Sequence, residues 1–249
     1  MKQFRSEFAH NYGTYTFGYA NYAKREAGEA LSEIYESGYL PYSGAREVRD
    51  TFYMARSARL NLKFFQSSSE NRRIAKKFDG VFTKERAPLE RVRNDETFLL
   101  FCLDYFEKRH GKAAMPRERL ELILDSGVIR SVVLYKKDSS AVAYVLEVSE
   151  TKMGHYWYSF YDLSLMNQSL GMWLMLDCVR DAKEKGLTYY YLGTVYGEKA
   201  LYKTNFEGLE WWDGTSWNSD VAKLRELGRS DNGQETAQID AWKNSLSRF

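Results

Sequence analysis

The residues best placed to bind an anion lie between an expected strand and an expected helix, from Ser159 to Gly171 (SFYDLSLMNQSLG). A strand that leads into a helix leaves free backbone N–H groups at the helix N-terminus, and these groups bind pyrophosphates or carboxylates. Asp162, at the end of the strand, has two interpretations: it orients or deprotonates an ammonium group, or it caps the helix. Gly171 also has two interpretations: it lets an anion approach the backbone, or it allows close packing against a sheet.

Other common catalytic patterns are absent from the sequence. It has no GxSxG, HExxH, GxxxxGK or GxGxxG motif. The three histidines, His10, His110 and His155, are scattered, and we expect structural or exposed positions for them. Cys102 and Cys178 each stand alone in an apolar run, so neither a metal site nor a disulfide is expected, and a reducing cytoplasm fits best.

The elements that must position these residues follow from hydrophobic periodicity. The pattern predicts helices over 97–110 and 116–125, three antiparallel strands over 128–135, 141–148 and 155–161, a helix over 167–185 and a strand over 189–192. This order is that of the N-acetyltransferase fold, an α/β architecture with a mixed sheet and flanking helices. That fold binds coenzyme A at a Gln/Arg-x-x-Gly-x-Gly/Ala turn. Gln168 and Gly171 keep the first two positions, but Trp173 replaces the small third residue.

Charge is unevenly distributed along the 249 residues, although the net charge is only +2. The segment from Arg46 to Arg93 holds 13 basic and six acidic residues, whereas Glu207 to Phe249 holds five basic and eight acidic residues. The basic segment indicates either an anionic partner or an ordinary solvated surface. No uncharged stretch reaches 18 residues, so we expect neither secretion nor a membrane span.

The first ninety residues predict a small basic module. They predict a helix over about 26–37 that ends at Gly38, a strand over 59–64, and a helix capped by Ser67 to Ser69. We therefore expect a basic, tyrosine-rich module over 1–95, an acyltransferase-like domain over 96–215, and an acidic tail or helix over 216–249. The capped helix carries four clustered cations that are candidates to grip a phosphate backbone: Arg72, Arg73, Lys76 and Lys77.

Five linked blocks resemble the C-terminal half of the arginyl- and leucyl-tRNA–protein transferases. They are FYDL at 160–163, SLG at 169–171, AKEKGL at 182–187, YYLG at 190–193 and ALYKTNFEGLE at 200–210. Weaker likeness upstream, at 36–44 and 65–73, extends the resemblance from about Gly28 to Glu210. The N-terminal cysteines common in the family are missing, so no function attached to them is carried over. Leu163, Thr194 and Gly208 also depart from the family pattern, which leaves donor and acceptor specificity open.

The resemblance implies transfer of an amino acid, arginine or leucine, from aminoacyl-tRNA to the α-amino group of a protein or peptide. Because the ester is already activated, the protein needs mainly to position two substrates, stabilise an oxyanion and handle one proton. In the family, the acceptor begins with an acidic or oxidised residue and is marked for degradation. Asp162 and Tyr161 are then the catalytic candidates. The candidates for binding the aminoacyl-adenosine end are Ser169, Leu170, Gly171, Gly193, Tyr202, Lys203 and Asn205.

The same resemblance predicts that Arg72, Arg73, Lys76 and Lys77 contact the tRNA acceptor stem. Core packing is the alternative role for Tyr161 and Tyr202. We expect no metal, no cofactor besides the aminoacyl-tRNA co-substrate, no membrane partner and a cytoplasmic monomer. Two other functions stay open: a coenzyme A-dependent N-acyltransferase, and a non-catalytic relative that binds tRNA or a degradation signal.

Overall fold

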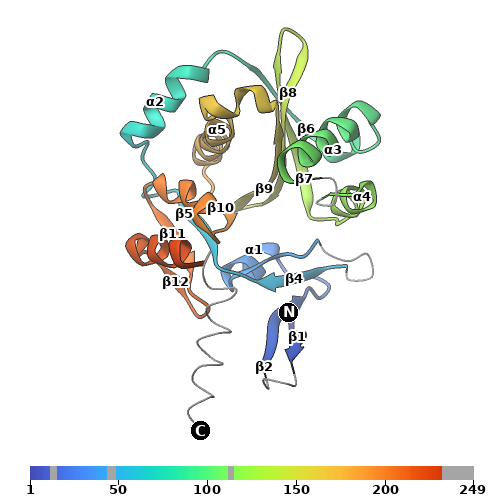
Figure 1. The fold of residues 1–249 in the computed structure, drawn as a ribbon, viewed down its shortest axis with the longest axis vertical. Helices are drawn as coiled ribbons and strands as arrows, with labels where there is room; N and C mark the ends of the chain where they lie inside the picture. Colours follow the sequence, from blue (N-terminus) through green and yellow to red (C-terminus); the bar gives the residue numbers. More distant parts are fainter. Residues whose placement is uncertain (12–15, 44–48, 112–114, 232–249) are drawn as a thin grey trace.

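The computed structural model describes residues 1–11, 16–43, 49–111 and 115–231 (Figure 1). Gly44, Arg46, the side chain of His10 and residues 232–249 of the expected tail lie outside the described residues. The elements follow in the order β1 (Lys2–Asn11), β2 (Thr16–Lys24), α1 (Leu31–Glu36), β3 (Tyr39–Pro41), β4 (Thr51–Met54), β5 (Ser57–Asn61), α2 (Ser69–Phe78), β6 (Thr83–Pro88), η1 (Leu89–Arg91), α3 (Glu96–His110), α4 (Arg117–Leu124), β7 (Ile129–Lys137), β8 (Ser140–Glu150), β9 (Met153–Tyr161), η2 (Leu163–Gln168), α5 (Leu170–Glu184), β10 (Tyr189–Thr194), η3 (Glu198–Asn205), β11 (Leu209–Trp212) and β12 (Trp217–Asn218).

A large mixed sheet has the strand order β12-β11-β5-β10-β9-β8-β7-β6. The consecutive strands β7, β8 and β9 form the expected antiparallel meander. Strand β10 then pairs with β9 in parallel, after the crossover through α5. The mixed α/β class and the strand–helix order of the acyltransferase-like domain are therefore confirmed.

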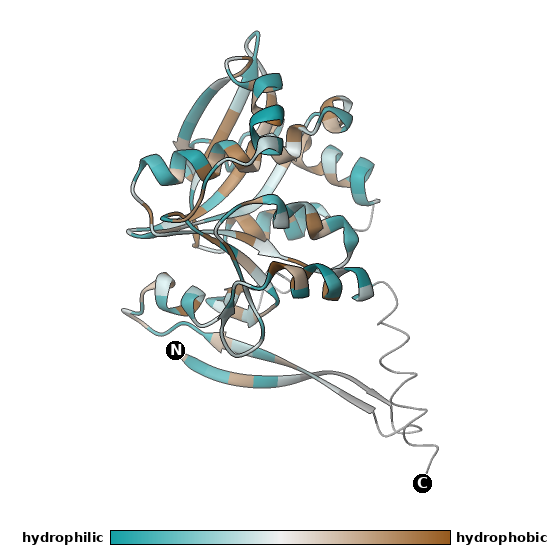
Figure 2. Ribbon diagram, turned by 90° about the vertical axis from the view of Figure 1, so that its left-hand side faces the viewer, coloured by the Kyte–Doolittle hydropathy of each residue, from teal (hydrophilic) through white to brown (hydrophobic). Residues whose placement is uncertain are grey.

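Helices cover both faces of the large sheet. Alternate residues of β7 point to opposite faces, so Val132 packs with α3 and α4 whereas Val133 packs with α2 and α5. Figure 2 shows the apolar residues gathered in the interior, where the helices meet the sheet. The site region is therefore built on a sheet that is held from both sides.

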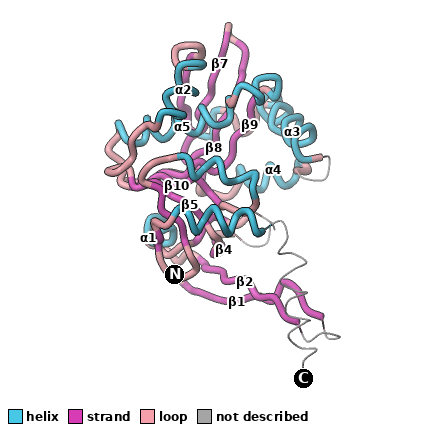
Figure 3. The backbone as a smooth tube through the Cα atoms, turned by 60° about the vertical axis from the view of Figure 1, so that its left-hand side comes forward, coloured by secondary structure: helices cyan, strands magenta, loops and turns pink. Residues whose placement is uncertain are grey.

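A smaller antiparallel sheet has the order β1-β2-β4-β3 and packs with α1 against one end of the large sheet. Its core includes Tyr35 and Phe52, together with Val148 of β8 and Tyr191 of β10. The β1–β2 hairpin extends away from the large sheet (Figure 3). The small sheet thus places α1 and β4 beside the ends of β9 and β10.

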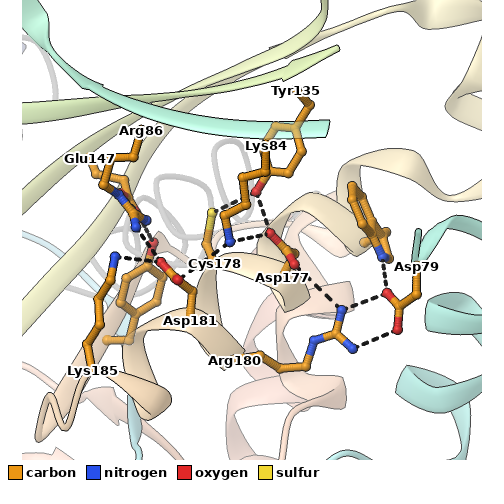
Figure 4. Close-up of polar contacts among 12 residues, drawn as sticks. Asp79, Lys84, Arg86, Tyr135, Glu147, Asp177, Cys178, Arg180, Asp181 and Lys185 are labelled. Atoms are coloured by element: carbon orange, nitrogen blue, oxygen red, sulfur yellow. Dashed lines mark hydrogen bonds and ion pairs between the residues drawn. The ribbon is translucent and has the colours of Figure 1, made fainter. Parts of the chain in front are cut away.

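Ion pairs attach the edge strand β6 to α5 (Figure 4). Arg86 of β6 pairs with Glu147 of β8 at 2.8 Å and also with Asp181 of α5. Lys84 pairs with Asp177 at 2.7 Å. The buried Glu147 also accepts a hydrogen bond from the Tyr190 hydroxyl at 2.7 Å. This network holds α5, β8 and β10 together on one side of the sheet.

Two expected helices have different boundaries in the structure. The helix expected from residue 26 begins at Leu31, because the Glu150 carboxylate accepts from the backbone N–H groups of Leu31 and Ser32 at 3.1 and 2.8 Å. Because Glu150 belongs to β8, the residues next to α1 in the sequence do not indicate this cap. The helix expected over 167–185 is divided at Ser169, whose left-handed conformation separates η2 from α5.

The large sheet takes strands from both sides of the boundary expected at residue 95. Strand β5 lies between β10 and β11, and β6 forms the other edge beside β7. The strand expected over 59–64 is β5 itself, displaced to Ser57–Asn61, and a further helix covers residues 221–231 of the expected tail. None of the helices in the described part of the chain has the length and apolar character of a membrane span.

Candidate active site

The parallel strands β9 and β10 diverge after a short pairing. They pair only from Met153 to His155 and from Tyr189 to Tyr191. Beyond this point β10 pairs with β5 through Gly193 and Thr194, while β9 continues alongside β8. Such a divergence opens the sheet at its centre and exposes backbone and side chains of both strands.

A cavity of about 290 Å³ occupies this opening. Helices α3 and α5, strands β3 and β4, and η3 complete its walls. Its lining residues are Leu40, Tyr53, Tyr105, Phe106, His110, His155, Tyr156, Trp157, Tyr158, Ser159, Met175, Leu192, Gly193, Thr194, Tyr202 and Lys203. Seven of these sixteen residues are Tyr, Phe or Trp, and none of the described lining residues carries a carboxylate.

Lys203 brings a positive charge into this cavity. Its Nζ donates a hydrogen bond to the Thr194 carbonyl oxygen at 2.7 Å. Burial lowers the pKa of Lys203 to about 8, because desolvation disfavours the charged ammonium. No acidic side chain forms an ion pair with Lys203 in the described residues. At neutral pH the cavity therefore contains an ammonium group without a neighbouring carboxylate.

His155 lies in the same cavity and is only 1% exposed. Its Nδ1 is 2.9 Å from the hydroxyl of Tyr35 in α1, whereas its Nε2 has no hydrogen-bond partner in the described structure. Burial, together with the charge of Lys203, lowers the pKa of His155 to about 3. The imidazole is therefore neutral at physiological pH.

Gly193 leaves space between these two side chains. It has a φ of +81°, and a Cβ built on it would lie 3.6 Å from His155 Nε2 and 3.7 Å from Lys203 Nζ. Both nitrogens thus border one small space in front of the Gly193 backbone. Gly193 and Lys203 are among the residues predicted from the sequence, but His155 is not, because the partner that fixes it lies 120 residues away.

Tyr161 and Tyr202 come together with Tyr105 beside the cavity. The Tyr161 and Tyr105 rings are 5.0 Å apart between centroids. Burial and the neighbouring Tyr161 raise the pKa of Tyr202 to about 12, although 40% of its side chain surface is exposed. The exposed part of Tyr202 leaves an aromatic face at the cavity entrance.

The other predicted residues of the strand–helix junction lie outside the cavity lining. Gly171 packs against Tyr161, whose hydroxyl oxygen would be 2.9 Å from an added Cβ. Leu170 is buried in the core, Ser169 precedes α5, and Asn205 is exposed at the end of η3. Among these predicted residues, the cavity lining brings together Gly193, Tyr202 and Lys203.

Asp162 is exposed, and it caps η2 by accepting from the Ser164 backbone N–H at 2.9 Å.

Replacing Asp162 by Ser keeps a capping oxygen but removes the carboxylate, whereas Ala removes both. We expect Asp162→Ser to retain transfer within about threefold and Asp162→Ala to lose about 1 kcal/mol of stability. Initial rates of aminoacyl transfer and urea unfolding measure the two effects. Equal loss of transfer in both variants, with unchanged stability, would instead assign the carboxylate a catalytic role.

The four predicted tRNA-binding cations lie on the solvent side of α2. Asn71, Ile74, Ala75 and Phe78 form its buried side. Ser68 caps the helix, as expected, through a reciprocal capping box with Asn71. Arg73 pairs with Glu70, and Lys77 Nζ donates to the Gln168 carbonyl oxygen at 3.3 Å. Helix α2 thus lies beside the junction that precedes α5.

A larger hollow of about 790 Å³ lies at the opposite ends of β9 and β10, beside α1. Its acidic residues include Glu36 and Glu150, but Glu36 pairs with Arg59 and Glu150 caps α1. The smaller cavity is therefore the better candidate site, because His155 Nε2 has no hydrogen-bond partner and Lys203 has no carboxylate beside it in the described structure.

Residues 96–213 match the family model described as "Arginine-tRNA-protein transferase, C terminus". Two relatives named "Aspartate/glutamate leucyltransferase" were found as well. The one from Dinoroseobacter shibae is 31% identical over 178 residues, covering 65% of this chain and 61% of the relative. The one from Ruegeria pomeroyi is 32% identical over 172 residues, covering 66% and 61%. Residues 96–213 are thus similar to the C-terminal part of the arginine-tRNA–protein transferases, and the chain as a whole is similar to bacterial leucyltransferases.

The match to this transferase family includes most of the cavity. Of the lining residues, Leu40 and Tyr53 alone lie outside the matched segment 96–213. The chain spans about three fifths of the length of the curated relatives it matches. Among solved structures, the C-terminal domain of a putative lysylphosphatidylglycerol synthetase from Agrobacterium fabrum matches with a TM-score of 0.42 and 17% identity, covering 66% of this chain and 50% of that one.

Proposed function

We propose that this chain transfers an amino acid from aminoacyl-tRNA to the amino terminus of an acceptor protein or peptide. The match of residues 96–213 to the family model and the cavity between β9 and β10 support this proposal. In the reaction, the acceptor amine attacks the ester carbonyl carbon, a tetrahedral oxyanion forms, and the ester C–O bond breaks. The amine loses a proton and the ribose oxygen gains one, so the protein has to position the substrates and assist one proton transfer.

The aromatic residues beside the cavity are suited to the 3′ end of the tRNA. Tyr202 presents a partly exposed ring there, next to Tyr161. Nucleobases stack on such rings without strong sequence preference. The exposed cations of α2 are our proposed contacts to the acceptor stem, an interaction that weakens with salt. The remaining predicted residues of the junction stay candidates for holding the aminoacyl-adenosine.

We further propose leucine rather than arginine as the donated amino acid. The observation that carries this choice is the charge of the cavity lining, which contains the Lys203 ammonium and no carboxylate side chain among the described residues. A guanidinium group would be repelled by Lys203 and would find no acidic partner. The relatives from D. shibae and R. pomeroyi are named leucyltransferases, with aspartate and glutamate in the same names.

The structure gives less support to a coenzyme A-dependent reaction at the start of α5. Trp173 is buried there, and its Nε1 donates to Asp79 at 2.8 Å. Lys77 of α2 contacts the Gln168 carbonyl beside the same helix start. Helix α2 therefore occupies one side of the position where a pyrophosphate would bind. We propose that the reaction uses no cofactor apart from the aminoacyl-tRNA co-substrate.

We also propose that the protein acts as a monomer in the cytoplasm and marks acceptors for degradation. Cys102 and Cys178 are both free and buried, as expected for a protein in a reducing compartment. Marking for degradation is what the resemblance to the arginyl- and leucyl-tRNA–protein transferases implies.

Purified protein mixed with radiolabelled leucyl-tRNA or arginyl-tRNA and a panel of acceptor peptides tests the donor. We expect leucine transfer to exceed arginine transfer by at least about 100-fold, as in other sites that must bury an unpaired charge to accept the wrong substrate. Faster arginine transfer would overturn the choice of donor. If neither amino acid is transferred, tRNA binding with a steep salt dependence would favour a non-catalytic relative. Thermal stabilisation by acetyl-coenzyme A alone would favour the N-acyltransferase.

A further inference from the structure

His155 has a buried nitrogen that lines the β9–β10 cavity without a partner. The residue is 1% exposed, and its Nε2 has no hydrogen-bond partner among the described residues. Tyr156 also has an unpartnered side-chain atom, but it packs in the same core as α5. An unpaired buried polar atom is costly, so native proteins rarely keep one without a use. The geometry at His155 therefore points to a polar ligand atom beside Nε2.

The Tyr35 hydroxyl determines which nitrogen of His155 carries the proton. It lies 2.9 Å from Nδ1, and Tyr35 itself is fully buried. A phenol is a stronger acid than a neutral imidazole N–H, and an imidazole nitrogen accepts hydrogen bonds better than a phenol oxygen. Tyr35 therefore donates to Nδ1, and the ring proton is on Nε2. Because burial lowers the pKa of His155 to about 3, the ring is a neutral N–H donor at physiological pH.

This donor borders the space in front of Gly193. A Cβ built on Gly193 would lie 3.6 Å from Nε2, and glycine leaves that position empty. An oxygen at the same position needs to move only about 0.5 Å nearer to enter the range of N–H···O hydrogen bonds. The pairing of β9 with β10 ends at His155 and Tyr191, so a substrate oxygen can lie between the two strands here.

The ester in the proposed reaction has one oxygen that becomes a stronger acceptor as the reaction proceeds. When the amine nitrogen bonds to the carbonyl carbon, the π electrons of the C=O bond move to the carbonyl oxygen and make it an oxyanion. When the C=O bond forms again, the ester C–O bond breaks, and the ribose oxygen takes the proton that the amine loses. A fixed N–H donor stabilises the oxyanion more than the carbonyl and keeps its own proton. In other enzymes, a neutral imidazole polarises a carbonyl in this way.

We propose that His155 Nε2–H donates a hydrogen bond to the ester carbonyl oxygen and to the oxyanion formed from it, with Tyr35 as a positioning residue. This inference rests on the proposed function, because it takes the ester of aminoacyl-tRNA to occupy the cavity. Tyr202 lines the same cavity at its entrance, where the adenosine is proposed to stack. The ester then lies farther in, toward Gly193.

Four variants separate the donor from its structural surroundings. His155→Leu removes the donor, whereas His155→Gln keeps an N–H group. Because His155→Leu leaves the Tyr35 hydroxyl unpaired, combining it with Tyr35→Phe removes both partners of the hydrogen bond and protects folding. Tyr35→Phe alone tests the positioning role. Its matched control is Tyr135→Phe, because Tyr135 is also buried and donates to Asp177 at 2.7 Å, outside the cavity lining.

Binding of two stable compounds to the tRNA-free protein tests the donor without the reaction. Both compounds join a leucine analogue to the 3′ position of adenosine, one through an amide with a planar carbonyl and one through a phosphonate with tetrahedral, anionic oxygens. His155→Leu is expected to weaken binding of the phosphonate by about 100-fold and of the amide by no more than about fivefold. Structural damage to the cavity would instead weaken both to the same extent.

Single-turnover transfer of leucine to a saturating acceptor peptide measures the chemical step. His155→Leu, alone or with Tyr35→Phe, should slow this step by about 100- to 1000-fold, the effect of losing one oxyanion donor. His155→Gln should be at least about tenfold faster than His155→Leu. Tyr35→Phe should be roughly tenfold slower than wild type, because the ring is no longer held in one tautomer and orientation. Tyr135→Phe should stay within about twofold of wild type, because it leaves the cavity intact.

Nitrogen NMR of labelled histidine shows the tautomer directly. We expect the proton on Nε2 of His155 in wild type and a mixture of tautomers in Tyr35→Phe. A wild-type proton on Nδ1 would overturn the assignment. Equal loss of affinity for both compounds, or His155→Leu that transfers leucine as fast as wild type, would overturn it as well. If wild type binds neither compound and transfers no leucine, the proposed function fails, and this inference fails with it.

Discussion

Replacing Gly193 by Ala is expected to lower kcat/KM for transfer by about 100-fold or more while leaving the protein folded. The added methyl group would lie 3.6 and 3.7 Å from the nitrogens of His155 and Lys203, which is ordinary contact distance. It would therefore fill the space between them without a clash. A displacement of about 1 Å in substrate position is enough for a rate loss of this size. The backbone cost of Ala at a φ of +81° is about 1 kcal/mol.

Gly186 provides a matched control for this substitution. It has a similar φ of +75°, but no atom lies within 4 Å of an added Cβ. Gly186→Ala should therefore share the backbone cost and keep full activity. Steady-state kinetics and urea unfolding of the two variants separate strain from loss of space. An active Gly193→Ala variant would mean that substrates do not enter the space in front of Gly193.

Replacing Glu147 by Gln is expected to reduce the free energy of unfolding by about 3 kcal/mol, which corresponds to roughly 10 °C in Tm. Glu147 is 5% exposed and is shared by Arg86, Ser131 and Tyr190. Loss of its charge leaves the Arg86 guanidinium without one of its two carboxylates. Breaking one partner of a buried ion pair is costly, because the other charge stays desolvated.

Glu85→Gln, on the edge strand β6, is the control. Glu85 forms ion pairs with Arg91 and Lys136, but it is about half exposed. Solvent screens such pairs, so this variant should lose no more than about 0.5 kcal/mol. Equilibrium unfolding in urea compares both variants with wild type. If the two substitutions had equal effects, the network in Figure 4 would contribute no more than surface ion pairs do.

Hydrophobic periodicity predicts most of the elements between residues 97 and 192, because their local pattern matches their burial. Helix α3, the β7–β8–β9 meander and β10 lie where the sequence indicates, within a few residues. The start of α1 was missed because its cap, Glu150, comes from β8. Strand β6 was missed because most of its residues are polar and exposed at a sheet edge.

The candidate site could be predicted only in part for the same reason. Lys203 and Gly193 lie in blocks that resemble the family, so both residues are predictable from the sequence. The role of His155 depends on Tyr35 and on the divergence of β9 from β10. Neither feature can be predicted from the residues next to His155 in the sequence. Asp162 illustrates the reverse case, since a carboxylate before a helix predicts a cap and a base equally well.

The position of β5 also affects how the chain can fold. Residues 57–61 lie between β10 and β11, whose sequences come about 130 residues or more later. Contacts between residues this distant in sequence form late, and they reduce the folding rate. During synthesis, β5 cannot pair with β10 and β11 until nearly the whole chain has been made. The segment 96–213, which matches the family model, does not include β5. If this segment were produced alone, the edge of β10 would be exposed and could pair with other chains.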